Sequence, residues 1–394
     1  LPLVQAGVGT PGKAPYTVKQ ALAINRRLVS QSTLAQWLPT MDTGSGAKQY
    51  LNCENVAVTP ASVPLGTSSV VGFDASSPTT ASAIGLSGQV NIAYESTDHL
   101  YLTSSGTQMG YCSCVYYGRG LPFWSPSNKT AIFQFDLNGD QASHVATGTV
   151  NGSIADRYSM DEVGGILRVA TTTTSNKPDS SGNYTQSSSV ITLKQVGRNL
   201  KQDGRLDGLG NNESLTAARW FDTFAVVSTS ANVDPLYTID LRDPAHPKLL
   251  GSLQIPGFSG YFHPIGNGQL LGLGQNVTFN NFGEQSQAQV GLFDISNLAA
   301  VKRLSIISMS LWTTLNATSD PHAFTWLADH SVALTSVSTA TGSLVLGEFK
   351  VNGQTLTRKI VNLTSTDPSM VRTMELPNGK VVLMDGGRVT FLGL

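Results

Sequence analysis

Short segments in which apolar and polar residues alternate fill most of the chain, and one such segment recurs. Each copy ends in an apolar residue followed by aspartate, passes through a turn and continues into a second strand-like run. Alternation with a period of two is typical of β-strands. The aspartates of the four clearest copies are Asp74, Asp136, Asp240 and Asp294. The second of the three intervals is about twice the others, so we infer a copy without aspartate at residues 190–208.

Two more strand-like runs follow each repeated hairpin, as in residues 259–275, and Asp, Asn or Gly lies between them. Four short strands per repeat are typical of a β-propeller blade. Six such units fill residues from about 66 to 386. The sequence therefore predicts an all-β chain, residues 1–394, that forms a single β-propeller of about seven four-stranded blades.

The C-terminal strand, residues 387–394, is expected to close the ring. We expect it to join the strand-like residues 1–7 and 50–58 in a seventh blade, because closure removes exposed sheet edges. One helix, about residues 17–38, interrupts the scheme near the N-terminus, and Pro39 is expected to end it. Its predicted apolar stripe consists of Val18, Ala21, Leu22, Leu28 and Val29.

The repeated aspartate has a structural explanation. It follows a strand and precedes a turn, where a carboxylate can accept hydrogen bonds from backbone N–H groups. We therefore interpret it as a turn residue, not as a repeated catalytic or metal-binding group.

Charge is scarce in this chain and does not cluster. Only 13% of its residues are charged and the formal net charge is -1. This argues against nucleic acid as a partner, which requires a basic patch. No apolar run is long enough for a transmembrane span. The weakly charged, Ser- and Thr-rich composition and the start at Leu1 favour a secreted or cell-surface protein that is processed or a fragment.

Two kinds of extracellular modification are candidates. Cys53 is predicted to form a disulfide with Cys112 or Cys114 in an oxidising compartment, and the alternative is three reduced cysteines. Asn183 is the first candidate for N-glycosylation, because it lies in the longest polar loop. The other N-x-S/T sequons are at Asn128, Asn151, Asn212, Asn276, Asn316 and Asn362.

Residues 154–173, 234–274 and 291–296 resemble the secreted β-propeller domain family that is distantly related to WD-repeat proteins. Residues 21–39, followed by Cys53, also resemble the inserted helix of that family. The resemblance extends from about residue 15 to 394 and implies the fold and secretion. It implies no enzymatic activity. Members of that family carry further blade-like sequence before the point where this chain starts, which fits a processed or shortened form.

Three groups of residues are candidates for chemistry. Asp156, Asp161 and Glu162 form an acidic cluster around Tyr158, which predicts a ligand or cation site at one face of the propeller; the alternative is capped turns with an Arg157 or Arg168 ion pair. His263 and His322 occupy similar places in neighbouring repeats, so a metal site is one interpretation and hydrogen bonds between blades the other. Asp136, Asn138 and Asp140 resemble the start of a calcium loop or form only a hairpin turn.

No nucleophile elbow, zinc motif or phosphate-binding loop is found in the sequence. The first functional hypothesis is therefore a non-enzymatic extracellular scaffold that binds a protein partner or belongs to a surface assembly. The second is a secreted hydrolase or lyase with its active site at the axial face of the propeller. No cofactor is predicted, and calcium is the one alternative.

Overall fold

The computed structural model describes residues 3–8, 14–42, 46–59, 63–64, 66–77, 81–112, 121–175, 184–210, 212–230, 234–255, 257–280 and 283–393. Over this part of the chain the structure is built of strands, with one α-helix and short 3₁₀ turns, which confirms the all-β prediction. The chain divides into two compact units, residues 1–126 with 131–148 and residues 127–130 with 149–394. None of the helices described has both the length and the apolar character needed to cross a membrane.

The smaller unit begins with the helix α1 and a short hairpin, followed by two groups of strands. β3 runs parallel to β5, which pairs antiparallel with β4. The strands β6, β7, β8 and β9 are neighbours in this order within their sheet. The elements are α1 (Val18–Gln31), β1 (Thr40–Asp42), β2 (Ala47–Gln49), β3 (Val56–Val58), β4 (Ser68–Phe73), β5 (Ala81–Ser87), β6 (Ile92–Glu95), β7 (His99–Cys112), β8 (Leu121–Asn138) and β9 (Gln141–Asn151).

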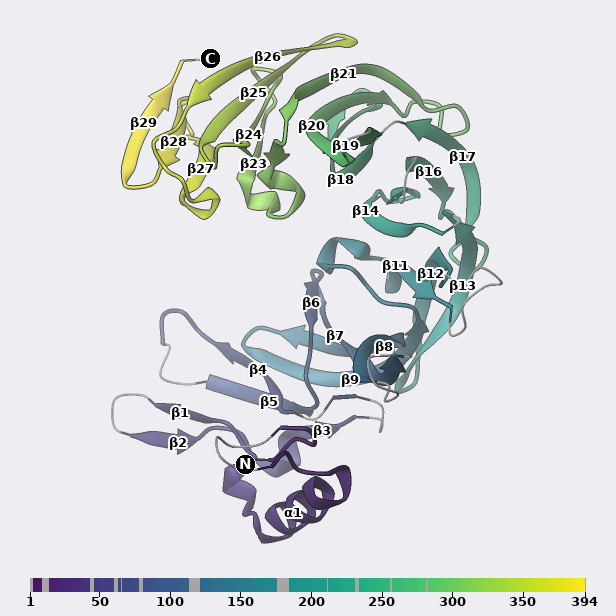
Figure 1. Ribbon diagram of the computed structural model, residues 1–394, viewed down its shortest axis with the longest axis vertical. Helices are drawn as coiled ribbons and strands as arrows, with labels where there is room; N and C mark the ends of the chain where they lie inside the picture. The colour runs from purple at the N-terminus through teal and green to yellow at the C-terminus, as the bar shows by residue number, and fades with distance from the viewer. Residues whose placement is uncertain are drawn as a thin grey trace. The chain divides into compact units, whose positions relative to one another are not determined.

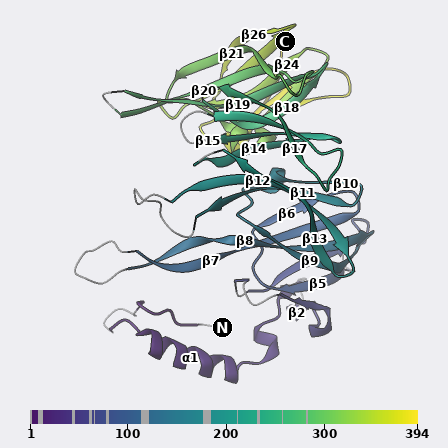
Figure 2. The same cartoon turned by 90° about the vertical axis from the view of Figure 1, so that its right-hand side faces the viewer.

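α1 is shorter than predicted (Figure 2). Thr17 caps its start in a capping box with Gln20, and the helix ends at Gln31 instead of at Pro39. Ser32 ends it, because its backbone is extended and its hydroxyl donates to the Val29 carbonyl. Of the predicted apolar stripe only Ala21 is buried, whereas Val18, Leu22 and Val29 are exposed.

The larger unit consists of successive antiparallel sheets in chain order. The first three contain β10 (Met160–Val163), β11 (Ile166–Thr174), β12 (Gln186–Val196), β13 (Asn199–Leu209); β14 (Ser214–Trp220), β15 (Phe224–Ser230), β16 (Asp234–Asp240), β17 (Lys248–Ile255); and β18 (Phe258–Gly266), β19 (Gln269–Asn280), β20 (Gly283–Asp294), β21 (Lys302–Leu311). The last two contain β22 (Thr314–Leu315), β23 (Phe324–Leu327), β24 (Val332–Ser338), β25 (Leu344–Asn352), β26 (Thr355–Asn362); and β27 (Val371–Glu375), β28 (Val381–Asp385), β29 (Arg388–Leu392).

Within this unit the first strand of a sheet lies on the inner side and the last on the outer side, as β14 and β17 show in Figure 1. The hairpin of β19 and β20 extends beyond its neighbours β18 and β21 (Figure 2). Successive sheets share apolar cores. Val226 and Leu236 of one sheet cluster with Phe262 and Phe293 of the next. The buried faces thus cover one another in series.

The sheet boundaries are shifted by one hairpin from the predicted repeat. Asp240 ends β16 and Asp294 ends β20, so the repeated hairpin is the outer half of a sheet, and the two runs after it begin the next. The tail strand β29 pairs with β28 as the third strand of its sheet, and β3 of the smaller unit pairs with β5. Closure of the ring by the tail stays a prediction.

The repeated aspartates act as turn residues at three of the four copies. Asp74, Asp240 and Asp294 each accept a hydrogen bond from the backbone N–H two residues on. Hydrogen bonds from the side chains of Ser76, Arg242 and Ser296, together with these backbone bonds, stabilise the charged carboxylates and lower their pKa values. The fourth, Asp136, instead faces His99, with its Oδ1 3.4 Å from Nε2.

A recurring joint connects the turns that follow Asp136, Asp240 and Asp294 to the preceding sheet. The carbonyl oxygen of the fourth residue after the aspartate accepts a hydrogen bond from a hydroxyl of that sheet. The pairs are Thr192 with Pro244, Thr238 with Leu298, and, in the smaller unit, Ser82 with Asp140. Each hydroxyl thus satisfies a carbonyl that packing removes from water.

A glycine lies directly across the hairpin from each of these hydroxyls. The facing pairs are Gly204 with Thr192, Gly251 with Thr238, and Gly72 with Ser82. A Cβ at Gly204 would lie 2.2 Å from the Pro244 oxygen, and one at Gly251 2.7 Å from the Leu298 oxygen. The absence of a side chain is therefore what lets the carbonyl approach.

We expect Gly204→Ala to lower the free energy of unfolding by about 1–3 kcal/mol, because the new methyl group meets a backbone atom that cannot move aside. Urea unfolding monitored by circular dichroism measures it. Gly387→Ala is the control, since a Cβ there meets nothing within 4 Å. Equal losses of unfolding free energy in Gly204→Ala and Gly387→Ala would show that the close approach of the Pro244 carbonyl to Gly204 does not matter for stability.

Stability should also depend on Asp240 at low pH. Hydrogen bonds from the Arg242 side chain and backbone lower the Asp240 pKa to about 2. A folded-state pKa below the unfolded value of 3.8 contributes stability that is complete above pH 4 and is lost as the pH falls through 2. Asp240→Asn should therefore be less stable than the parent at pH 7, with a difference that shrinks towards pH 2. Urea midpoints across this range test it, with the exposed Asp329→Asn as control.

Candidate functional site

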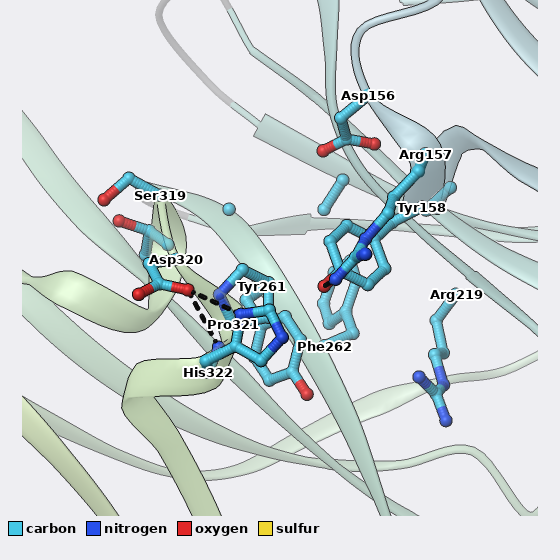
Figure 3. A pocket seen from close by; sticks show the side chains of 14 residues that line it. Asp156, Arg157, Tyr158, Arg219, Tyr261, Phe262, Ser319, Asp320, Pro321 and His322 are labelled. Carbon is cyan, nitrogen blue, oxygen red and sulfur yellow. Dashed lines mark hydrogen bonds and ion pairs between the residues drawn. The ribbon is translucent and has the colours of Figure 1, made fainter. Parts of the chain in front are cut away.

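A cavity of about 290 Å³ opens on the inner side of the larger unit (Figure 3). Three consecutive residues of β14 and three of β18 line it, together with two short turns that precede β10 and β23. The polar residues that matter most below are Asp156, Arg157, Tyr158, Arg219, Asp320 and His322. The site is thus assembled from the beginnings of four successive sheets.

Two aspartates shape the turns that enter the cavity. Asp156 caps the 3₁₀ turn Arg157–Ser159, where its carboxylate accepts from the Ser159 backbone N–H at 2.9 Å and the Ser159 hydroxyl at 3.1 Å. Asp320 caps the turn Pro321–Ala323 in the same way, accepting from the His322 N–H at 3.0 Å. Carboxylates are favoured at such positions because they satisfy N–H groups that lack a partner in the turn.

Arg157 and Tyr158 form one wall, on the right in Figure 3. The Arg157 guanidinium lies 4.9 Å from the Tyr158 ring centre and donates to the Tyr158 hydroxyl at 2.7 Å. The Trp220 indole N–H donates to the Tyr158 carbonyl at 2.9 Å, which fixes this turn on β14. A cation over an aromatic face is a stable arrangement that leaves the positive charge available.

Arg219 is the second cation of the cavity. Its Nε atom is buried and has no hydrogen-bond partner among the described residues. Within that same part of the chain, no carboxylate lies at ion-pair distance from Arg219 or from Arg157. Buried donors without a partner are rare in proteins, and those that occur call for an explanation.

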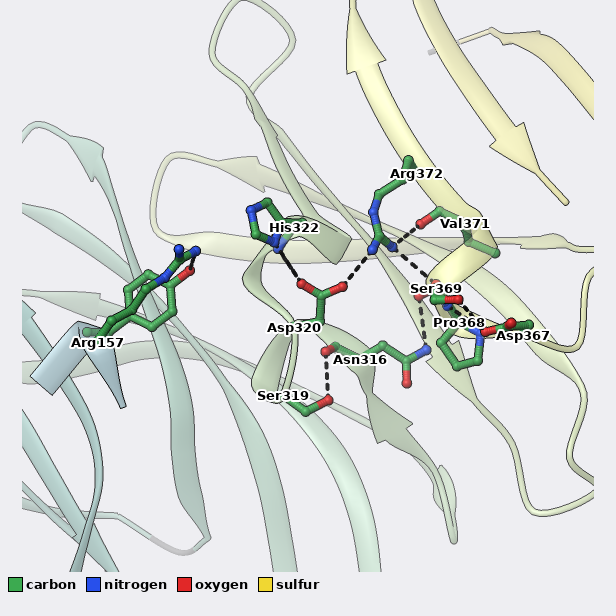
Figure 4. A network of polar contacts seen from close by, with 12 residues as sticks. Arg157, Asn316, Ser319, Asp320, His322, Asp367, Pro368, Ser369, Val371 and Arg372 are labelled. Carbon is green, nitrogen blue, oxygen red and sulfur yellow. Dashed lines mark hydrogen bonds and ion pairs between the residues drawn. The ribbon is translucent and has the colours of Figure 1, made fainter. Parts of the chain in front are cut away.

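Asp320 organises the opposite wall (Figure 4). Its two oxygens accept from His322 Nδ1 at 3.0 Å and from Arg372 at 2.7 Å. Arg372 also donates to the carbonyls of Val371 and Pro368. Burial acts to raise the pKa of Asp320, but the hydrogen bonds from His322 and the charge of Arg372 outweigh it and lower the pKa. Asp320 is therefore a charged carboxylate whose two oxygens both accept hydrogen bonds.

Aromatic side chains surround His263 behind the cavity. Its ring centre lies 4.7 Å from that of Phe324 and 6.4 Å from that of Trp326, and its Nδ1 is 3.3 Å from the Tyr261 hydroxyl. Burial, aided by the positive charge of Arg219, lowers the pKa of His263 to about 4. Burial also raises the pKa of Tyr261. His263 is thus a neutral packing residue at physiological pH.

The predicted acidic cluster is divided by the structure. Asp156 and Tyr158 line the cavity, whereas Asp161 and Glu162 lie on β10 and are not part of its wall. The buried Arg168 forms an ion pair with Asp161 and donates to the carbonyls of Phe221 and Asp222. For Asp161 the alternative interpretation, an ion pair with Arg168, is therefore the observed one.

The two histidines have different surroundings: His322 pairs with Asp320 in the cavity, and His263 packs among aromatic rings. The part of the chain that the structure describes contains no group of three or more His, Cys, Asp or Glu side chains that could hold a metal ion. Asn138 and Asp140 flank the β8–β9 turn, with Gly139 at φ +61°. This is the hairpin turn of the alternative interpretation.

The candidate disulfide and glycosylation residues differ in exposure, and some of them lie outside the described residues. Cys53 is an exposed free thiol, whereas Cys114 and the side chain of Cys112 lie outside the described residues, so the disulfide stays a prediction. Asn183 and the side chain of Asn128 also lie outside them. Asn151, Asn212 and Asn362 are exposed, and Asn276 is half-buried. Asn316 is buried and donates to the Ser336 hydroxyl, so this sequon is not accessible to a glycan.

Sequence reasoning missed Arg219, Tyr261 and Asp320. Arg219 and Tyr261 lie on the first strands β14 and β18, just after a repeated hairpin. Asp320 precedes a proline at the start of a turn, which is a capping pattern. The sheet boundaries observed here make β14 and β18 first strands. A repeat divided at these boundaries would have grouped Arg219 with Tyr261.

The chain was then compared with known proteins. The Beta propeller domain family matches residues 11–373. This chain belongs to that family. The β-propeller fold predicted from the repeats is thereby confirmed.

Two archaeal proteins to which the chain is similar are named as uncharacterised. One, from Methanocaldococcus jannaschii, is 33% identical over 204 residues, which are 52% of this chain and 30% of that protein. The other, from Archaeoglobus fulgidus, is 31% identical over 205 residues, 52% of this chain and 29% of that protein. This chain therefore matches less than a third of the length of either relative.

Solved structures resemble this propeller only at low identity. Sqt1 of Saccharomyces cerevisiae is 8% identical, with a TM-score of 0.38 over 77% of this chain and 87% of Sqt1. A variant of the Synechocystis apocarotenoid oxygenase is 10% identical, with a TM-score of 0.36 over 62% of this chain and 56% of the oxygenase.

The pKa of His263 provides a test of the site. We expect its imidazole to stay neutral from pH 8 to 5 and to take up a proton only near pH 4, because burial disfavours the cation. Proton NMR of the imidazole signals measures this, with His263→Gln to assign the peak. Protonation of His263 between pH 7 and 6 would contradict its burial.

Proposed function

We propose that this propeller is a non-enzymatic, extracellular or cell-surface binding domain that holds an anionic group of a partner in the cavity of the larger unit. The observation that carries the proposal is Arg219, a cation in the cavity wall without a carboxylate partner among the described residues. A guanidinium binds carboxylate or phosphate through a planar pair of N–H donors. Charged residues are scarce in the chain as a whole, so an arginine without a carboxylate partner is a distinctive feature of this cavity.

The two carboxylates of the cavity argue for binding over hydrolysis. Acid catalysis at neutral pH needs a carboxyl group whose pKa is raised, as in glycosidases. The pKa of Asp320 is lowered, and its oxygens are engaged by His322 and Arg372. Asp156 is engaged in capping its turn. Both acids are therefore used to build the cavity.

Secretion is part of the proposal and rests on the sequence. The weakly charged, Ser- and Thr-rich composition supports it, as does the resemblance to a secreted propeller family. The exposed sequons at Asn151, Asn212 and Asn362 are compatible with a glycosylated protein.

A secreted hydrolase or lyase is the second candidate, and Asp320 with His322 favours it. Asp320 orients the His322 ring through Nδ1, and the His322 side chain is 68% exposed. A histidine held in this way can act as a general base. Ser319, which lines the same cavity, donates its hydroxyl to the Asn316 carbonyl. Turnover of a polysaccharide or ester panel that His322→Gln abolishes would favour this candidate.

The binding proposal predicts that Arg219 controls partner capture. In chemical cross-linking from native material, the parent chain should capture a partner that Arg219→Gln captures at least about tenfold less, as expected for losing a charge-assisted hydrogen bond. Arg198→Gln is the matched control, because it removes one positive charge from the exposed β12–β13 turn. Equal capture by Arg219→Gln and Arg198→Gln would overturn the proposal.

A further inference from the structure

The size and charge of the cavity restrict its ligand further. Its volume of about 290 Å³ is at the lower end of the range of roughly 300–1,000 Å³ for ligand pockets. One small ring fits in such a space, but not a nucleotide or a folded peptide. The ligand, or the part of it that enters, is therefore small.

The charges of the wall favour one negative charge over two. Arg157, Arg219 and Arg372, the ion-pair partner of Asp320, contribute three positive charges, and Asp156 and Asp320 contribute two negative ones, which leaves one positive charge in excess. A dianion such as a phosphate monoester carries more negative charge than this excess balances. A carboxylate carries one charge and matches the planar guanidinium of Arg219.

The remaining polar groups of the wall suit a ligand rich in hydroxyl groups. Each carboxylate oxygen accepts more than one hydrogen bond, so Asp156 and Asp320 keep acceptor capacity beyond their turn-capping bonds. The hydroxyls of Thr318 and Ser319 line the same space. A ligand hydroxyl can donate to the acids and accept from the serine or threonine.

Aromatic rings complete the set. Tyr158 and Tyr261 are half-buried and both line the cavity (Figure 3). The negative face of an aromatic ring attracts groups with slight positive charge, such as the C–H bonds on one face of a sugar ring. Cation, acceptors and aromatic faces therefore occur together in one small volume.

We propose that the cavity binds a hexuronate, a single sugar ring with one carboxylate, with Arg219 on the carboxylate and Asp156 or Asp320 on the hydroxyls. This inference rests on the proposed function and specifies its ligand class. Free hexuronates and hexuronate residues of a polysaccharide present the same chemistry.

Isothermal titration calorimetry of the full chain tests the inference. Galacturonate and glucuronate are the probes, a galacturonate trimer represents the polysaccharide, and glucose, acetate and inorganic phosphate are the comparison ligands. We expect at least one hexuronate probe to bind at least about tenfold more tightly than glucose or acetate, and Arg219→Gln to remove that difference. Arg198→Gln should bind as the parent does, and preference for the trimer would identify a polysaccharide source.

The outcomes separate the two proposals. Phosphate or acetate binding as tightly as any hexuronate, with loss in Arg219→Gln, would overturn the hexuronate inference and leave the anion-binding function in place. No binding of any hexuronate probe, combined with Arg219-dependent partner capture, would also overturn the inference alone. If no anion binds and capture does not depend on Arg219, both proposals fail.

Discussion

The carbonyl that the turns after Asp136, Asp240 and Asp294 insert into the preceding sheet is the contact on which the packing of these sheets depends. It requires a hydroxyl on one strand, a glycine directly opposite and a turn whose fourth residue presents its carbonyl oxygen. The same arrangement occurs between Ser82, Gly72 and Asp140 in the smaller unit. Because a buried carbonyl without a partner is costly, the joint allows only one register between neighbouring sheets. At Asp240 and Asp294 the aspartate also accepts a backbone hydrogen bond within the turn that delivers the carbonyl.

The joints and the cavity occupy different strands of the sheets. The joints lie on outer hairpins, such as β16 with β17, whereas the cavity is lined by first strands and the turns before them. Substitutions in the cavity wall therefore leave the hydroxyl–carbonyl contacts intact. That is the general logic by which one repeat scaffold can carry different sites.

The electrostatics of the cavity follow from how its turns are built. Asp156 and Asp320 are there to cap one-turn 3₁₀ helices, and Asp320 also binds Arg372. Their negative charges are thus largely compensated within their own turns. Arg219 has no such local partner, and the aromatic cluster around His263 stays neutral. Arg219 is thus a cation of the cavity wall without a carboxylate partner among the described residues.

From the sequence alone we could predict the all-β class, the four-strand repeat and the turn role of Asp240 and Asp294. These features are local, because period-two alternation and Asx turns depend on neighbours within a few residues. The sequence prediction misplaced the end of α1, since Ser32 competes with the helix through a local bond that propensity does not reveal. It placed Asp156, Tyr158 and His322 among the candidates but could not separate them from Asp161, which folding pairs with Arg168. Contacts between residues some sixty positions apart, such as Trp220 with Tyr158 or Thr238 with Leu298, exist only once successive sheets pack. The cavity and its uncompensated arginine therefore belong to the packed fold, because no local pattern encodes which first strands will face one another.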